Sequence, residues 1–166
     1  MSQIVSAVGL DSLVIAPLEP SSALPARIAD IQFSFWGFLT GFQSAAEYER
    51  FLRRAVTASR LPAILTAKRG GKFAGSVNLL ERETIDCPGL TPWIGQLFVV
   101  EEERGHGVGR ALVDAAVTRA TALGYRRVHL FTSGTLPRFY AARGWKPIDT
   151  VEHLGKPRMI MAFDTL

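Results

Sequence analysis

The stretch Glu103-Arg104-Gly105-His106-Gly107-Val108-Gly109-Arg110-Ala111-Leu112 decides the fold of this chain. It follows an apolar run over residues 94–100, and apolar side chains then recur at a spacing of four from Val108 to Ala120. This pattern predicts a strand that turns into a helix through three glycines. The first turn of a helix leaves N–H groups without partners, and glycines let a ligand approach the backbone closely. We therefore predict that this turn binds an anion, most often a phosphate.

Two common phosphate-binding motifs do not fit the spacing of these glycines. A Walker A loop needs a lysine directly after its last glycine, and no lysine follows here. A G-x-G-x-x-G dinucleotide fingerprint that starts at Gly105 or Gly107 ends on Arg110 or Leu112 instead of glycine. The spacing that remains is R-x-x-G-x-G over residues 104–109.

This motif resembles the [Q/R]-x-x-G-x-[G/A] signature of the GNAT family of N-acetyltransferases, which binds the pyrophosphate of acetyl-coenzyme A. The segment F-Y-x-x-x-G-W over residues 139–145 is similar to a second motif of that family. Strand-like segments at residues 96–100, 129–132 and 159–163 resemble its fourth, fifth and last strands. The resemblance runs from about residue 94 to the C-terminus. Before residue 94 the pattern is only compatible with the family.

Length and composition indicate one α/β domain over residues 11–166 after a flexible leader over residues 1–10. A hydrophobic content of 48% with 20% charged residues is typical of a soluble globular protein. The single cysteine, Cys87, excludes an intramolecular disulfide and a zinc site built from cysteines. The first residues lack the basic region that precedes the apolar part of a signal peptide, and no apolar run approaches membrane-spanning length, so we expect a cytoplasmic protein that does not bind membranes.

The net charge of +4 favours an anionic ligand, but the basic residues do not form a tract. A solvated basic surface explains them better than nucleic-acid binding, and we expect no nucleic-acid partner. The histidines His106, His129 and His153 lack the spacing of metal ligands, so no metal is expected. A homodimer is common in the family that the chain resembles, and a dimer is therefore possible here.

Periodicity and turn signals divide the chain into eleven elements. We expect helices over residues 24–38, 45–59, 107–124 and 135–143, and strands over residues 13–18, 61–68, 73–83, 93–100, 126–132, 145–149 and 158–163. Ser44 and Glu47 form a capping box, and Thr135 is an N-cap. Gly95, inside a strand, indicates a bulge or a close backbone approach.

The resulting order, β-α-α-β-β-β-α-β-α-β-β, is the one that the GNAT resemblance implies. It corresponds to a mixed sheet with helices on both faces. The strands at residues 93–100 and 126–132 should be parallel, because a helix crosses between them. In the family these two strands, the fourth and fifth, splay apart.

The resemblance also implies how acetyl-CoA, as the acetyl donor, is bound. The pantetheine arm lies between the splayed strands and pairs with the backbone of Phe98, Val99 and Val100. The pyrophosphate takes N–H groups from the glycine turn, that is from Arg104, Gly105, His106, Gly107, Val108, Gly109 and Arg110.

Tyr140 matches the family tyrosine that faces the sulfur of coenzyme A, and a neutral phenol donates a proton to a departing thiolate. An alkylamine is mostly protonated at neutral pH, so a base is needed as well. Many relatives carry an acidic residue on the fourth strand, where this chain has Gln96. Glu81 is the best substitute, acting through water. Glu83 and Glu152 are weaker candidates, and a mechanism without a dedicated base is the alternative.

The acceptor site should be lined by Trp36, Trp93 and Glu152, with Phe35 and Phe42 nearby. Aromatic rings with carboxylates suit a cationic amine. Phe33, Phe38 and Phe139 are expected in the core. The function predicted is acetyl transfer from acetyl-CoA to the primary amine of a small molecule, by direct attack on the thioester. The alternatives are a non-catalytic acyl-CoA sensor or partner module, an acetyltransferase for protein N-termini, and a nucleotide-binding domain with the same glycine turn.

Overall fold

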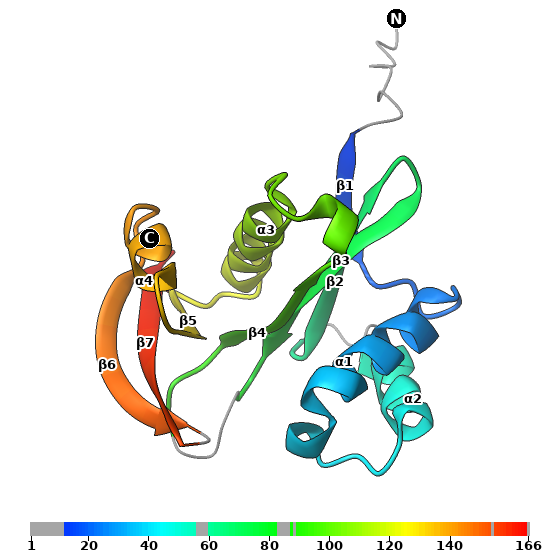
Figure 1. The fold of residues 1–166 in the computed structure, drawn as a ribbon, viewed down its shortest axis with the longest axis horizontal. Coiled ribbons are helices and arrows are strands. Elements are labelled where there is room, and N and C mark those ends of the chain that lie inside the picture. Colours follow the sequence, from blue (N-terminus) through cyan, green and yellow to red (C-terminus); the bar gives the residue numbers. More distant parts are fainter. Residues whose placement is uncertain (1–11, 56–59, 83–86, 88, 154, 166) are drawn as a thin grey trace, which may run out of the picture.

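The computed structural model describes residues 12–55, 60–82, 87, 89–153 and 155–165. Its sheet has seven strands in the order β1-β2-β3-β4-β5-β7-β6 (Figure 1). The strands are β1 (Leu13–Pro17), β2 (Ala63–Arg69), β3 (Lys72–Leu80), β4 (Trp93–Val99), β5 (Arg127–Thr132), β6 (Lys146–His153) and β7 (Lys156–Asp164). The α-helices are α1 (Leu24–Thr40), α2 (Ala45–Ala55), α3 (Val108–Ala122) and α4 (Leu136–Ala141), and a 3₁₀ turn spans Glu101–Glu103. This confirms the predicted order of elements.

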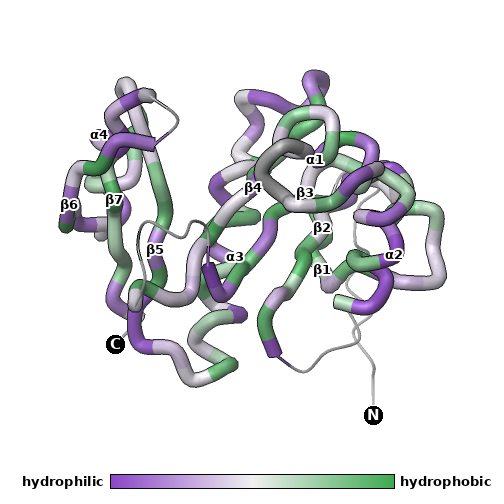
Figure 2. Tube along the Cα trace, turned by 90° about the horizontal axis from the view of Figure 1, so that it is seen from below, coloured by the Kyte–Doolittle hydropathy of each residue, from purple (hydrophilic) through white to green (hydrophobic). Residues whose placement is uncertain are grey.

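The sheet divides into two parts between β4 and β5. These strands are parallel, as predicted, but a single residue pair joins them, Trp93 with His129. All other neighbouring strands are antiparallel. Figures 1 and 2 show β1–β4 with α1 and α2 on one side of this junction, and β5, β7 and β6 with α4 on the other. The predicted splay of the fourth and fifth strands is confirmed.

Helices cover both faces of the sheet. On one face α3 buries Val108, Leu112 and Ala116 against the inward side chains of β2, β3 and β5, and Tyr140 of α4 joins this cluster. On the other face α1 and α2 pack Ile28 and Leu52 over Ile64 of β2. Burying a large aliphatic side chain contributes about 1.5–3 kcal/mol. These two apolar clusters therefore fix the helices on which the candidate site is built.

The capping box of α2 forms, with one change in its second bond. The backbone N–H of Glu47 donates to Ser44 Oγ at 3.1 Å, as predicted. The carboxylate of Glu47 accepts from the N–H of Gln43 at 2.8 Å, one residue before the expected position. Thr135 occupies the N-cap position of α4, as predicted, but its backbone is already in helical conformation and its side chain makes no capping hydrogen bond.

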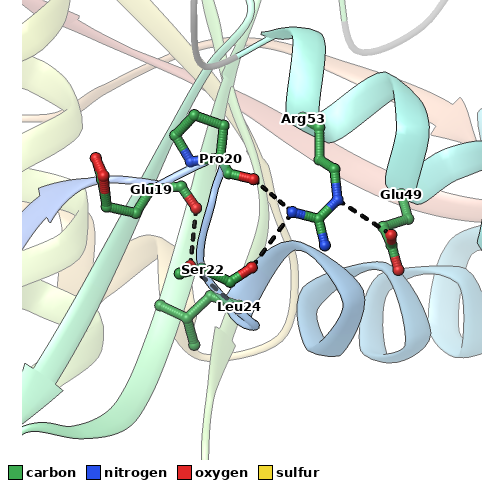
Figure 3. Close-up of polar contacts among 6 residues, drawn as sticks. All are labelled: Glu19, Pro20, Ser22, Leu24, Glu49 and Arg53. Carbon is green, nitrogen blue, oxygen red and sulfur yellow. Dashed lines mark hydrogen bonds and ion pairs between the residues drawn. The ribbon is translucent and has the colours of Figure 1, made fainter.

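Arg53 of α2 ties this helix to the turn before α1 (Figure 3). Its Nε pairs with Glu49 at 3.1 Å, and its Nη1 donates to the carbonyls of Pro20 and Ser22. Ser22 Oγ in turn accepts from the N–H of Leu24, the first residue of α1. One guanidinium thus fixes α1 and α2 relative to each other, which suits its fork of five donors.

Some expectations are corrected or lie outside the described residues. Phe139, expected in the core, is 38% exposed, and Arg143 stacks over its ring at 3.5 Å from the centroid. Phe33 is half-buried, as fits a core position at the edge. The leader over residues 1–10, Glu83, the end of the second predicted helix (residues 56–59) and the side chain of Phe38 are outside the described part. Within that part, no helix has the length and apolar character to cross a membrane.

Candidate active site

A β-bulge in β4 opens the gap toward β5. Gly95 lies opposite Asn78 of β3, and Phe98 lies opposite Ser76, so two residues of β4 face Val77 alone. The first of the two, Gln96, has a φ of +51°. A bulge bends its strand and increases its twist, and here it turns β4 away from β5. The bulge that Gly95 predicted is confirmed, although Gln96 is the residue in the unusual conformation.

The diverging strands enclose a cavity of about 150 Å³. Its walls come from β4, α3, β5 and α4, through Ile94, Gly95, Gln96, Leu97, Val113, Leu130, Phe131 and Tyr140. Five of these residues have apolar side chains, and Gln96 and Tyr140 are the two with polar ones. A small cavity that combines apolar side chains with a few polar groups suits the reactive end of an extended ligand.

The open edge of β4 offers backbone groups beside this cavity. The N–H of Val100 donates to Ala74 of β3 at 2.9 Å. Successive residues of a strand point their backbone groups to opposite edges, so the N–H and carbonyl of Val99 face the open edge. The carbonyl of Val99 accepts a bond from Arg104 Nε at 3.1 Å. Of the predicted backbone contacts, the N–H of Val99 therefore faces the open edge, whereas the carbonyl of Val99 already accepts from Arg104 and the N–H of Val100 is paired with β3.

The glycine turn forms a backbone cradle at the start of α3. Gly105 and Gly107 have φ angles of +78° and +82°, a region that L side chains rarely adopt. The first hydrogen bond of the helix runs from the N–H of Ala111 to the carbonyl of Gly107, so the N–H groups of residues 107–110 have no partner within the helix. No atom lies within 4 Å of the position that a Cβ would take at either glycine. The cradle is thus open, and its donors and helix dipole favour an anion.

The two arginines of the cradle, Arg104 and Arg110, contact residues close to them in sequence. Arg110 pairs with Asp114 one turn later, at 3.9 Å, and both are exposed. His106 is exposed and lies with Arg69 and Glu103 around a shallow cavity of about 490 Å³. Glu103, directly before the glycine turn, pairs with Arg69 at 3.0 Å.

Tyr140 is 9% exposed and lies in the wall of the cavity between β4 and β5. Its ring packs edge-on against Trp145, with the centroids 5.8 Å apart. The chain reverses at Gly144, where φ is +92°, and the N–H of Trp145 donates to the carbonyl of Tyr140 at 3.1 Å. Burial raises the pKa of the Tyr140 phenol above its ordinary value, and Arg143 opposes this weakly. The hydroxyl is therefore neutral and able to donate a proton at physiological pH.

The comparisons with known proteins agree with this geometry. The model of the acetyltransferase (GNAT) family matches residues 27–145, which is well over half of the chain. The chain belongs to the GNAT family. GNAT proteins are acetyltransferases that use acetyl-CoA. A comparison with curated protein sequences found no match.

Several solved GNAT structures share the fold at low sequence identity. An acetyltransferase from Streptococcus pneumoniae is 18% identical, with a TM-score of 0.67 over 91% of this chain and 98% of its own. The aminoglycoside 6′-N-acetyltransferase from Enterococcus faecium is 16% identical, with a TM-score of 0.67 over 92% and 97%. The yncA protein from Salmonella typhimurium, solved with acetyl-CoA, is 14% identical, with a TM-score of 0.68 over 93% and 95%.

The predicted acceptor residues of this GNAT chain do not all lie where an acceptor could reach them. Trp93 has no exposed surface, packs on Phe131 at 4.7 Å and donates to the carbonyl of Leu90, so we assign it to the core. Trp36 is partly exposed on α1. Glu81, directly after β3, and Glu152, on β6, are exposed on opposite sides of the β4–β5 junction.

Sequence reasoning missed a buried polar cluster on the α1–α2 face of this GNAT sheet. Gln32, Tyr48 and Asn78 are 0%, 3% and 1% exposed and are hydrogen-bonded to one another and to Gln96. The available signal was a glutamine on the otherwise apolar inner face of α1, four residues after Ile28. A polar residue at such a position needs a partner, which the sequence does not identify.

Proposed function

We propose that this GNAT protein transfers an acetyl group from acetyl-CoA to the primary amine of a small molecule. Acetyl-CoA supplies an activated acetyl thioester, which an amine attacks directly. The observation that carries the proposal is the cavity between β4 and β5, which has Tyr140 in its wall. The open edge of β4 and the glycine cradle of residues 104–110 follow it along the chain.

The residues present fit coenzyme A in two respects. The cradle offers a pyrophosphate the N–H groups of residues 107–110, which have no partner within the helix, and two of its glycines have positive φ angles. The N–H of Val99 faces the open edge of β4, where an amide carbonyl of a pantetheine arm can accept from it.

In the proposed mechanism Tyr140 is the general acid that protonates the leaving thiolate. Its raised pKa keeps the proton on the phenol until it is needed. Glu81 is the proposed base for the incoming amine, and it acts through water because it is exposed and lies beyond the end of β3.

The proposed acceptor surface lies on the α1 side of β4. Phe35 is 56% exposed, and its ring is 5.5 Å from Trp36 and 6.1 Å from Phe98. A cationic amine can bind over the face of an exposed aromatic ring, and an apolar part of the amine can pack against it. Glu152 on β6 adds a carboxylate from the other side of the junction.

The test is release of free thiol from acetyl-CoA, measured with and without polyamines, aminoglycosides, amino acids and short peptides. We expect release that depends on one class of small amine. Release with short peptides alone would point to a protein N-terminus as the acceptor. Tight acetyl-CoA binding without release across the panel would replace the proposal by that of a non-catalytic acyl-CoA sensor.

A further inference from the structure

Gln96 adopts a strained backbone conformation at the point where β4 leaves β5. Among the described residues, it alone combines a side chain with a positive φ, at +51°. Residues other than glycine avoid this region, and they stay there only where the surrounding structure holds them. Something in this chain must therefore stabilise the bulge.

The buried polar cluster provides that support. Asn78 Nδ2 donates to Gln96 Oε1 across the β3–β4 pair. Gln32 Nε2 of α1 donates to Asn78 Oδ1 at 2.9 Å, and the hydroxyl of Tyr48 of α2 donates to Gln32 Oε1 at 2.5 Å. Asn78 Nδ2 also lies 3.3 Å from Gln32 Oε1. Asn78 of β3 thus connects the side chains of α1 and α2 to the side-chain amide of Gln96 on β4.

The directions of these bonds fix the role of each amide. Because Gln32 donates to the oxygen of Asn78, the amide nitrogen of Asn78 is left to donate to Gln96. The oxygen of Gln96 is therefore occupied, and a side-chain amide has no lone pair on nitrogen that accepts a proton at neutral pH. Gln96 does not replace the acidic residue that relatives carry on this strand. Its side chain serves as the anchor of the bulge.

We propose that Gln32, Tyr48 and Asn78 are positioning residues for acetyl transfer, which hold Gln96 in its left-handed conformation and thereby aim the open edge of β4 at the donor. The inference rests on the proposed function. It goes further by making the α1–α2 pair, which does not touch the cavity, a determinant of donor binding and turnover. In this proposal the α1–α2 pair acts on the donor by fixing the backbone conformation of Gln96, and the side chain of Gln96 takes no part in the reaction.

A matched pair of variants separates backbone from side chain. Gln96→Ala and Gln96→Gly both remove the anchor, but only glycine adopts a positive φ without strain. Because both variants lose the same contribution of the side chain, we expect Gln96→Ala to lose about tenfold more than Gln96→Gly in acetyl-CoA affinity, kcat or both. Equal losses in the two variants would overturn the proposal, because the side chain itself would then be what matters.

Tyr48→Phe tests the distal end of the cluster with the smallest change of shape. We expect it to lower the acetyl-CoA affinity or kcat several-fold in the wild-type background, and to have no further effect in the Gln96→Gly background. A merely structural role predicts a lower Tm in both backgrounds and unchanged kinetic constants. Equal kinetic losses in both backgrounds, or no loss in either, would contradict the proposal. Asn78→Ala gives the same comparison nearer the bulge, with circular dichroism as the check on folding.

A readout without donor or acceptor keeps this test apart from the proposed function. Hydrogen exchange of the backbone amides of residues 96–99 is measured in the free protein. We expect faster exchange in Gln96→Ala than in wild type or Gln96→Gly. If wild type releases no thiol with any amine, the proposed function fails, and this exchange pattern still decides whether the cluster holds the bulge.

Discussion

At the scale of the single residue, Tyr140 is where the proposed chemistry is most directly testable. Tyr140→Phe keeps the ring that packs on Trp145 and removes the hydroxyl in the cavity wall. We expect kcat to fall at least about tenfold with acetyl-CoA affinity preserved, because general acid catalysis contributes about 10²–10⁴-fold. Tyr125→Phe is the matched control and should leave kcat unchanged. Wild-type turnover in Tyr140→Phe would remove this tyrosine from the mechanism.

The pH dependence of Tyr140 follows from the direction of its pKa shift. Burial raises the pKa of the phenol above its ordinary value of about 10, so the hydroxyl keeps its proton throughout the physiological range. Loss of kcat through ionisation of Tyr140 should therefore begin only above about pH 10. A limb of the pH–rate profile that titrates near neutrality must belong to another group, and it should persist in Tyr140→Phe.

Two glycines of the cradle respond differently to substitution. At Gly107 the φ of +82° is unfavourable to any side chain and most of all to a β-branched one, so Gly107→Val should abolish acetyl-CoA binding. The fold should survive, because no atom lies within 4 Å of the added Cβ. At Gly109 a Cβ meets Val99 and Leu97 at 3.6 and 3.8 Å, which is ordinary contact, and Gly109→Ala should bind normally. Calorimetry with coenzyme A measures both, and full affinity in Gly107→Val would exclude the cradle as the anion site.

At the scale of elements, His129 closes the narrow end of the β4–β5 junction. Its backbone N–H and its Nδ1 both lie 3.0 Å from the carbonyl of Pro92, and the side chain is 3% exposed. A carbonyl only accepts, so Nδ1 carries the proton of the neutral ring, and Nε2 is buried without a partner among the described residues. Burial is the main cause that lowers the pKa of His129, and the charge of Arg127 lowers it further. The hydrogen bond to Pro92 and the charge of Asp164 raise the pKa but do not reverse the shift.

This shift predicts acid sensitivity at the junction. With the folded pKa below the unfolded one, the unfolded chain binds more protons as the pH falls below about 6.5, so the free energy of unfolding decreases toward lower pH. His129→Gln keeps a donor for Pro92 and removes the titration. We expect its Tm to fall less than that of wild type between pH 7 and pH 5, as measured by calorimetry. His106→Gln, at an exposed histidine, should behave as wild type, and an unchanged slope in His129→Gln would contradict the assignment.

The order of the elements and the glycine turn could be predicted from sequence because both depend on local signals. Glycine spacing predicted the cradle, a strand-interior glycine predicted the bulge, and a crossover helix predicted the parallel pair. The fate of single aromatic side chains could not be predicted in this way. Trp93 is in the core and Phe139 is on the surface, because packing between elements distant in sequence decides burial. The bond that Gln32 donates to Asn78 spans 46 positions, and the bond that Asn78 donates to the Tyr48 hydroxyl spans 30, beyond the reach of any local pattern.

At the scale of the whole molecule, the donor would bridge the two parts of the sheet. Coenzyme A that contacts β4, the cradle and β5 binds the folded state alone, and at about 100 times its Kd it should add about 2.7 kcal/mol to the free energy of unfolding. For a chain of this size that corresponds to a rise in Tm of roughly 5–10 °C. Gly107→Val should show no rise at the same concentration. A thermal shift that this variant retains would place coenzyme A elsewhere.

The insertion of α1 and α2 between two paired strands has a consequence for how such a protein can change over time. β1 and β2 meet at Pro17 and Leu65, so the segment between them leaves and re-enters the sheet at neighbouring positions. Recombination can therefore exchange the segment between β1 and β2 and leave the sequence from β3 onward, which carries the proposed acetyl-CoA site, unchanged. The seam is crossed by the bonds of Gln32 and Tyr48 to Asn78. An exchanged segment without equivalents of Gln32 and Tyr48 would leave the buried amide of Asn78 without these hydrogen-bond partners. Only segments that carry both residues should therefore be retained after such an exchange.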